Sequence, residues 1–310
     1  MAMNRLSRPA GHTTPPRVAL GPVPYHWSRE RLDAFYDWAV ASSVDIVYLG
    51  ETVCPKRRSY RGADWARVAA ALRQAGKEVV RSTLTLIEAA SELGAVQRLC
   101  ASDEPLVEVN DIGALQLRKG RPFVTGPAIN IYNAATLNRL AGLGLRRWVL
   151  PLELSRDTLA ALQAERPAGV ETEVLVHGRM ALAWSARCFT ARAHHLAKDE
   201  CGFCCLDYPD GMPLATREDE AFLQVNGVQL QSARPVNLIG AWDELLALGV
   251  DVVRVMPQAE GMDRVLAQVE ACRQGARSPA EAARALDALA EDGTCDGYWY
   301  GEAGLHRHAG

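Results

Sequence analysis

Short runs of apolar, mostly β-branched residues alternate along the chain with segments that have the periodicity of amphipathic helices. Eight of these runs are strongly apolar, which is typical of strands buried on both faces of a parallel sheet. They span residues 18–21, 45–49, 79–84, 106–109, 123–125, 147–150, 173–176 and 251–255. The pattern therefore predicts about eight buried strands.

Helical patterns separate most of the predicted strands. Segment 28–40 begins with a capping serine, Ser28, and places Leu32, Phe35, Tyr36 and Ala39 on one face. Similar periodicity is found in residues 64–75, 133–143, 155–166 and 241–248. Strand–helix alternation over about 240 residues is typical of a closed (β/α)8 TIM-like barrel. An open doubly wound sheet is the alternative, but no Gly-x-Gly-x-x-Gly follows the first strand.

The regular alternation is interrupted once, between residues 179 and 235. This interval holds a cysteine-rich loop and a segment that reads as a β-hairpin turning at Asn226-Gly227. We interpret it as an insertion after the seventh strand. The expected organisation is a disordered tail over 1–16, a single barrel domain over 17–300 with an insertion at about 179–235, and a C-terminal tail over 301–310.

Composition narrows the class of protein. With 310 residues and 48% apolar composition the chain can bury a large core, and its net charge of −3 provides no electrostatic argument for nucleic acid or an anionic membrane. No apolar run reaches the roughly 18–20 residues that span a bilayer, and the N-terminus does not resemble a secretory signal. We therefore expect a cytoplasmic protein. In that reducing compartment cysteines serve metal binding or catalysis more often than disulfides.

The eight cysteines fall into two groups. Cys100 and Cys272 lie in helical patterns and are expected to be small buried residues, while the role of Cys295, in a turn, stays open. The others are Cys54 and the cluster Cys188, Cys201, Cys204 and Cys205. Clustered thiolates need a neutralising metal, and soft sulfur ligands select zinc, copper(I) or iron–sulfur clusters.

The predicted barrel brings the remote cysteine and the cluster to the same rim. Cys54 follows the end of the second strand and Cys188 follows the end of the seventh, and functional groups of such barrels lie on these loops. Spacing alone leaves the metal open. A Cys-x3-Cys pair (Cys201, Cys205) without a second knuckle fits an iron–sulfur cluster about as well as zinc. His194 and His195 are rival zinc ligands, and spacing does not choose between Cys204 and Cys205.

Several segments resemble a known family. Residues 176–192 and 198–205 carry the strongest likeness, and further matching motifs are found at 20–23, 48–58, 91–94, 152–157, 226–229 and 295–299. Together they resemble the collagenase-like peptidase U32 family, in particular its ubiquinone-biosynthesis branch. The likeness extends from about Val18 to Trp299.

The resemblance implies a barrel fold and a [4Fe–4S] cluster held by Cys54, Cys188, Cys201 and Cys205. It further implies a subunit of an oxygen-independent hydroxylase of ubiquinone precursors, which forms a heterodimer with UbiU and works with the lipid-binding protein UbiT. Two alternatives are an RNA-hydroxylating relative and a zinc-stabilised scaffold without catalytic activity.

Other polar groups lie near predicted strand ends, but none stands out as a catalytic residue. They are the basic run Lys56-Arg57-Arg58, the residues Glu51, Glu108, Asn110, Asn130 and Glu153, and the arginines Arg179 and Arg187 that flank the cysteine loop. The basic residues could lie beside an anionic cluster or be ordinary surface charges. No Ser-His-Asp or Cys-His pattern is visible, so the catalytic residues stay unassigned.

Overall fold

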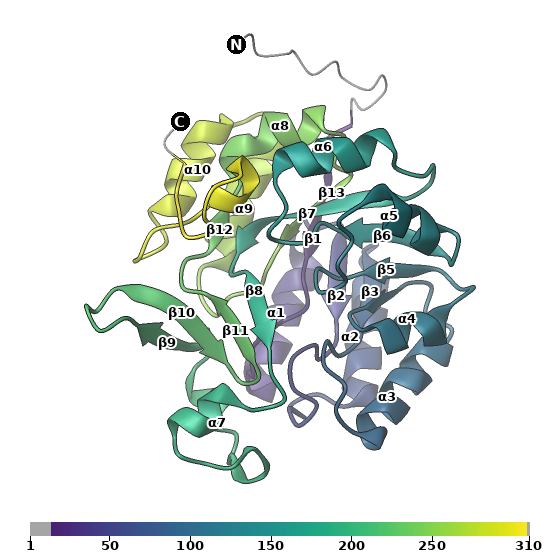
Figure 1. The fold of residues 1–310 in the computed structure, drawn as a ribbon, viewed down its shortest axis with the longest axis vertical. Helices are drawn as coiled ribbons and strands as arrows, with labels where there is room; N and C mark the ends of the chain where they lie inside the picture. The colour runs from purple at the N-terminus through teal and green to yellow at the C-terminus, as the bar shows by residue number, and fades with distance from the viewer. Residues whose placement is uncertain (1–13, 309–310) are drawn as a thin grey trace.

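The computed structural model of the chain describes residues 14–308, and most of the tail expected over 1–16 lies outside this range. Eight parallel strands close into a barrel, which confirms the predicted (β/α)8 TIM-like fold (Figure 1). They are β1 (Arg17–Leu20), β2 (Ile46–Leu49), β3 (Glu78–Ser82), β4 (Val107–Val109), β5 (Phe123–Thr125), β6 (Leu145–Val149), β7 (Glu171–Gly178) and β13 (Val252–Val255). Closure comes from the pairing of β6 with β7 and of β13 with both β7 and β1.

Helices cover the outside of the barrel. They are α1 (Arg29–Ala41), α2 (Gly62–Gln74), α3 (Ala90–Ala101), α4 (Ile112–Arg118), α5 (Ala134–Ala141), α6 (Arg156–Ala164), α8 (Trp242–Ala247), α9 (Met262–Arg273) and α10 (Pro279–Asp287). The predicted cap is present, because Ser28 accepts a hydrogen bond from the backbone N–H of Arg31. The four apolar residues predicted to share one face of α1 are those that it buries. Among the described residues no helix is long and apolar enough to cross a membrane.

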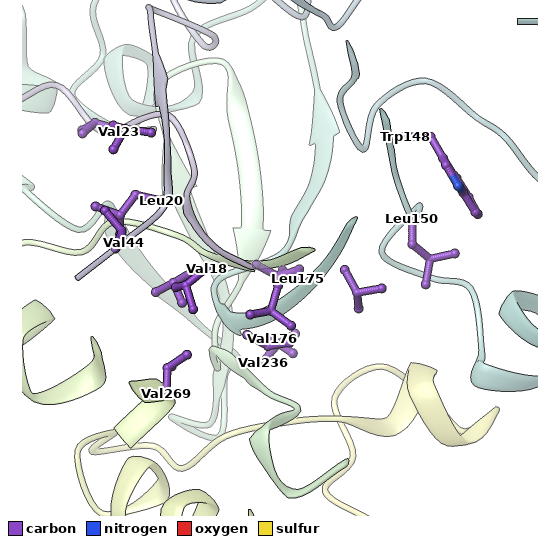
Figure 2. Packing of buried hydrophobic residues seen from close by; sticks show 14 of the residues in the cluster. Val18, Leu20, Val23, Val44, Trp148, Leu150, Leu175, Val176, Val236 and Val269 are labelled. Carbon is purple, nitrogen blue, oxygen red and sulfur yellow. The ribbon is translucent and has the colours of Figure 1, made fainter. Parts of the chain in front are cut away.

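Two apolar layers stabilise the barrel. The larger lies between the strands and the helices, and Figure 2 shows part of it around Val18, Leu20, Leu175 and Val176. The smaller fills the inside of the barrel with side chains from six of its strands: Ala19, Ile46, Tyr48, Val80, Val124, Val149 and Val252. Cys100 and Cys272 are buried in the larger layer, as predicted, and so is Cys295.

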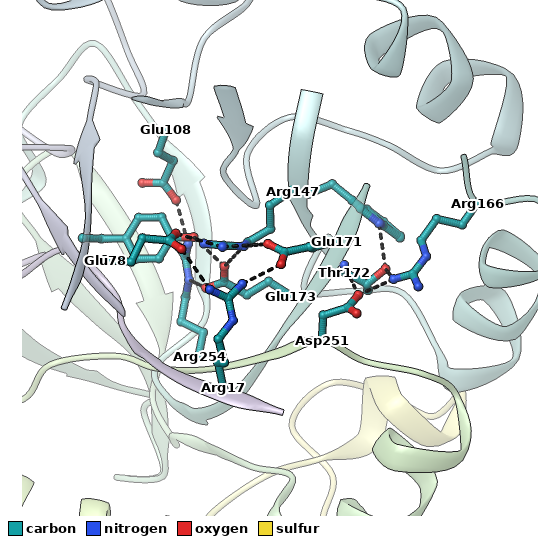
Figure 3. A network of polar contacts seen from close by, with 12 residues as sticks. Arg17, Glu78, Glu108, Arg147, Arg166, Glu171, Thr172, Glu173, Asp251 and Arg254 are labelled. Carbon is teal, nitrogen blue, oxygen red and sulfur yellow. Dashed lines mark hydrogen bonds and ion pairs between the residues drawn. The ribbon is translucent and has the colours of Figure 1, made fainter. Parts of the chain in front are cut away.

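The barrel interior also holds a network of buried charges, which Figure 3 shows. Arg254 pairs with Glu173 at 2.6 Å and with Glu108 at 2.9 Å. Its guanidinium carbon lies 4.0 Å from the ring centroid of Tyr48, and the Tyr48 hydroxyl donates to Glu173 at 2.5 Å. Arg147 donates to the Tyr48 hydroxyl at 3.2 Å. Glu108 is thus part of the structural framework of the barrel.

The segment after β7 forms a second, four-stranded antiparallel sheet in the order β8-β11-β10-β9. Its strands are β8 (Ala181–Trp184), β9 (Met212–Ala215), β10 (Ala221–Asn226) and β11 (Gln229–Ser232), and α7 (Phe189–Ala193) lies between β8 and β9 in sequence. The predicted hairpin is present, with Gly227 and Val228 as turn residues between the paired Asn226 and Gln229. The chain then returns to the barrel through β12 (Val236–Asn237), antiparallel to β7. Figure 1 shows this sheet and α7 at the lower left, apart from the ring of helices.

Residues 301–308, which fall in the expected C-terminal tail, pack back onto the barrel. Arg307 pairs with Asp296 at 2.6 Å and with Asp287, at the end of α10, at 3.1 Å. It also donates to the backbone carbonyl of Asn237 in β12 at 2.9 Å. These contacts join residues 301–308 to α10 and to β12.

Candidate metal centre

Five cysteines from two distant parts of the chain line one cavity. They are Cys54 from the loop after β2 and Cys188, Cys201, Cys204 and Cys205 from the insertion. The structure therefore brings together the four cysteines that were singled out as ligands. Cys204, which spacing did not distinguish from Cys205, lines the cavity too.

The loop after β2 is shaped by a carboxylate. Glu51 accepts hydrogen bonds from the backbone N–H groups of Val53, at 2.8 Å, and Cys54, at 3.0 Å. Two bonds to consecutive amides form a tight turn that orients Cys54. Glu51 therefore stabilises the loop, and this turn holds Cys54 close to the end of β2.

Three of the four cysteines of the insertion lie at helix starts, and Cys201 follows the short 3-10 helix Lys198–Glu200. Cys188 is the N-cap of α7, and its sulfur accepts a hydrogen bond from the Ala191 N–H at 3.4 Å. Cys204 and Cys205 lie in the short 3-10 helix Cys204–Asp207, which follows a left-handed turn at Gly202 and Phe203 (φ 55° and 57°). Amide groups at such starts are exposed donors that favour negative charge on sulfur.

Arg57 joins the two halves of the site. It is buried, and it donates to the Pro24 carbonyl at 2.6 Å and to Asn226 Oδ1 at 2.7 Å. Glu51 lies 3.9 Å from it. A Cβ at position 227 would lie 2.9 Å from the Arg57 guanidinium. The glycine in the hairpin turn, whose φ is +66°, therefore leaves room for Arg57. The middle residue of the basic run is thus a buried, positively charged part of the cavity wall.

The rest of the basic run behaves differently. Lys56 lines the cavity, donates to the Lys198 carbonyl at 3.0 Å and pairs with Asp199. Arg58 is exposed. Lys198 also lines the cavity and pairs with Glu88 at 2.6 Å. Arg57, Lys56 and Lys198 therefore surround the thiols with positive charge.

His26, a residue that the sequence pattern did not indicate, contacts the site directly. Its Nδ1 lies 3.3 Å from Cys205 Sγ, and the direction of this hydrogen bond depends on the tautomer. Burial, together with the neighbouring Arg57 charge, lowers the pKa of His26 to about 4, so the ring is neutral near pH 7. His26 lies in the loop between β1 and α1, and β1 is the neighbour of β2 in the barrel. The contact of His26 with the cysteine site therefore depends on the folded chain.

The pKa values of two thiols in the cavity, those of Cys54 and Cys205, are raised above the usual range of cysteine. Burial raises the pKa of Cys205 to about 11, against the lowering effect of Arg57, and burial also raises the pKa of Cys54. Neighbouring thiols add to this effect, since the proximity of Cys188 raises the pKa of both residues. Positive charge close to these sulfur atoms favours their thiolate form, as the lowering effect of Arg57 on the pKa of both residues shows.

The ligand spacing for a single metal ion differs from that for a cluster. Within residues 14–308, no three His, Cys, Asp or Glu side chains are grouped closely enough to hold one metal ion. A zinc ion with Zn–S bonds of about 2.3 Å brings its sulfurs to within about 4 Å of one another. The four thiolates of a [4Fe–4S] cluster lie roughly 6–7 Å apart because each binds a different iron. An all-cysteine cavity bordered by cations fits the donor set of such a cluster.

The remaining polar candidates lie elsewhere. His194 Nε2 is 3.1 Å from the Tyr208 hydroxyl, and neither His194 nor His195 lines the cysteine cavity. Asn130 and Glu153 line a separate cavity at the ends of β5 and β6, together with Asn110. Arg187 is exposed, and Arg179 lines a third cavity.

We predict that Arg57→Met destabilises the metal-free chain by about 2–3 kcal/mol, because the Pro24 carbonyl and the Asn226 side chain lose a buried charged donor. The neighbouring variant Arg58→Met changes an exposed side chain and should alter stability by less than about 0.5 kcal/mol. Urea unfolding followed by circular dichroism measures both. Equal stability of the two variants would show that Arg57 does not join the halves of the site.

The solved structures to which this chain is similar are remote in sequence. The U32 peptidase Mk0906 is 14% identical, with 83% of this chain and 98% of that chain covered and a TM-score of 0.44. The spore cortex-lytic enzyme SleL of Bacillus cereus is 9% identical, with 88% and 74% covered and a TM-score of 0.42. The dihydropteroate synthase of Xanthomonas albilineans is 13% identical, with 83% and 93% covered and a TM-score of 0.36. At such distances nothing about function follows from these likenesses.

The family is established by sequence instead. The profile of Peptidase family U32 matches residues 32–306, which include seven of the eight barrel strands, the insertion and all five cysteines of the cavity. The chain belongs to Peptidase family U32.

Proposed function

We propose that this chain is a UbiV-type iron–sulfur subunit that takes part in the oxygen-independent hydroxylation of ubiquinone precursors. Cys54, Cys188, Cys201 and Cys205 are the proposed ligands of a [4Fe–4S] cluster. The observation that carries the proposal is the meeting of Cys54 with three cysteines of the insertion in one cavity, although the chain separates them by more than a hundred residues.

The surroundings of the cavity suit a redox centre. When bound, a [4Fe–4S] cluster supplies one-electron transfer at a potential set by charge, hydrogen bonds to sulfur and solvent exposure. Arg57 and Lys56 supply positive charge, and the Ala191 N–H donates to Cys188. Each of these contacts favours the anionic form of the sulfur ligands.

Exposed apolar side chains of the insertion support a partner subunit. Leu196, Phe203, Leu206, Leu214 and Phe222 are each 41–45% exposed and all belong to the insertion, and Phe203 also lines the cysteine cavity. Large apolar side chains exposed on the segment that carries the cysteines favour coverage by another protein. We propose UbiU as that partner in a heterodimer, with the lipid-binding UbiT and a ubiquinone precursor as further components.

The contact between His26 and Cys205 raises a second candidate function, that of a thiol hydrolase. A nucleophilic cysteine needs a lowered pKa, supplied by a positively charged histidine or another cation. Here burial raises the pKa of Cys205 and lowers that of His26, and four further cysteines line the same cavity. The arrangement therefore favours metal binding over nucleophilic catalysis.

Anaerobic growth tests the proposed function. In cells that lack the corresponding gene, the wild-type chain should restore ubiquinone without oxygen, and Cys54→Ala should not, while aerobic synthesis should be equal in both strains. Co-expression with UbiU should yield a one-to-one complex on size-exclusion chromatography. Restoration of RNA hydroxylation in place of ubiquinone, or a purified protein that contains zinc without iron, would favour one of the two alternatives.

A further inference from the structure

His26 contacts the cysteine site from a part of the chain that carries none of its cysteines. It lies in the loop between β1 and α1, and its Nδ1 is 3.3 Å from Cys205 Sγ. His26 is 6% exposed, so water has little access to this contact. A buried polar group that contacts a ligand sulfur can tune a bound metal centre without binding the metal itself.

The backbone on both sides of His26 is held by the two halves of the site. Two residues before it, the Pro24 carbonyl accepts a hydrogen bond from Arg57, of the loop after β2, at 2.6 Å. Directly after it, the Trp27 indole N–H donates to the carbonyl of Pro209, in the insertion, at 2.7 Å. The short segment between these two contacts therefore has little freedom to carry the imidazole away from the sulfur.

The imidazole also packs on the segment that carries the contacted sulfur. Its ring centroid lies 5.6 Å from that of Phe203, with the two planes at 66°, which is a favourable edge-to-face arrangement. Phe203 is the residue directly before the short 3-10 helix that begins with Cys204 and Cys205. The ring is thus fixed against the same turn of the insertion from which Cys205 reaches the cavity.

Ligation of Cys205 would decide the direction of this hydrogen bond. In the metal-free chain either partner can donate, because the thiol carries a proton and a neutral imidazole has one donor and one acceptor nitrogen. A sulfur that binds iron is a thiolate and can only accept. His26 must then donate from Nδ1, and a protonated ring would donate from the same atom.

A donor at this position has a predictable effect on a redox centre. Hydrogen bonds to the sulfurs are among the factors that set the potential of an iron–sulfur cluster. The reduced cluster carries one more negative charge than the oxidised one, so the N–H group stabilises the reduced form more. The potential is therefore higher with the donor than without it.

We propose that His26 is a positioning residue that donates a hydrogen bond from Nδ1 to the metal-bound sulfur of Cys205 and thereby raises the reduction potential of the centre. This role rests on the proposed function, because it needs a cluster bound to Cys205. It adds to that function a determinant of potential in the loop after β1, outside the segments that supply the thiols.

A redox titration followed by electron paramagnetic resonance tests the proposal on the full chain, purified without oxygen together with any partner that co-purifies. His26→Phe keeps an aromatic ring and removes both nitrogens, so iron and sulfide should stay at the wild-type level. Its potential should be more negative by roughly 30–60 mV, which corresponds to about threefold to tenfold in the equilibrium constant for one-electron reduction. His26→Asn offers an amide N–H near the position of Nδ1, and its potential should lie closer to that of the wild type.

His194→Phe is the matched control, because His194 is an exposed histidine of the insertion that does not line the cysteine cavity. Its potential should equal that of the wild type. A second measurement needs no variant: pulsed electron paramagnetic resonance of the reduced wild-type chain with nitrogen-15 in its histidines should detect a weak nitrogen coupling. A hydrogen bond to sulfur gives a weak coupling, whereas a nitrogen bound to iron gives a strong one. This measurement decides the question if His26→Phe loses its iron.

Three results would overturn the proposal: an unchanged potential in iron-containing His26→Phe, equal shifts in His26→Phe and His26→Asn, or a nitrogen coupling in the wild type that is absent or as strong as that of a ligand. Wild-type protein without iron would overturn the cluster proposal and this one together. Wild-type protein with iron, whose potential does not respond to His26→Phe, would overturn the role of His26 alone.

Discussion

Cys54→Ala is expected to remove nearly all iron and sulfide from protein purified without oxygen, from about four of each per chain to a small fraction. The physical reason is that a cluster without the Cys54 thiolate has an iron corner without its ligand. The spare thiol, Cys204, belongs to the insertion and not to the loop after β2, and the other neighbours are a neutral, buried imidazole and cations. Cys188→Ala, Cys201→Ala and Cys205→Ala should have the same effect. Iron and acid-labile sulfide analysis, together with visible absorbance, measures it.

Two cysteine variants serve as controls. Cys204→Ala removes the fifth cysteine of the cavity and should retain the cluster, since the family pattern assigns the last ligand to Cys205. Cys100→Ala removes a small buried side chain between α3 and α4 and should lower stability without lowering iron content. Full iron and sulfide in Cys54→Ala would show that Cys54 is not a cluster ligand. Cluster loss in Cys204→Ala, with the cluster retained in Cys205→Ala, would show that Cys204 and not Cys205 is the last ligand.

Arg254→Met is expected to lower the free energy of unfolding by about 3–5 kcal/mol, because it leaves two buried carboxylates, Glu173 and Glu108, without their shared cation. Both carboxylates are about 1% exposed or less, so water cannot replace the lost partner. Urea unfolding of the metal-free chain measures the effect.

A surface variant gives the comparison. Arg31→Met breaks the pair with Glu260, whose side chain is 83% exposed, and should cost about 1 kcal/mol or less. The triple variant Arg254→Met/Glu173→Gln/Glu108→Gln should recover part of the loss of Arg254→Met, since it removes the unpaired charges. A loss for Arg254→Met as small as that for Arg31→Met would mean that the charges inside the barrel do not contribute to stability.

The strand pattern was readable because most positions of the barrel strands are apolar. Runs such as 45–49 and 251–255 consist mainly of apolar residues, with Arg254 as a buried exception, so local composition identified them, and the order of strands and helices then implied the parallel barrel. Helix starts were equally local, as the cap at Ser28 shows. The hairpin at residues 221–232 was predicted from a turn signal next to it in sequence.

The composition of the cysteine site could also be predicted, since it rests on residue types and on the loops that follow strands. Cys54 follows the end of β2, and the insertion that holds Cys188 follows the end of β7; a closed barrel brings such segments to one rim. The contribution of the loop after β1 could not be predicted. His26 reaches Cys205 only because the insertion extends from β7 across the ends of β13 and β1 toward β2.

By itself, then, the sequence determined the secondary-structure elements and their order, because these depend on local periodicity. It also indicated the family and the sulfur ligands to test, because these depend on motifs. Only the tertiary structure decided which polar side chains are buried and what they face. Arg57 and Arg58 are neighbours in one basic run, yet one is buried against Pro24 and Asn226 and the other is exposed. Arg254 and Glu108 meet inside the barrel from strands far apart in the chain. Such contacts depend on closure of the whole sheet, and a pattern along the chain carries no information about which side chains closure brings together.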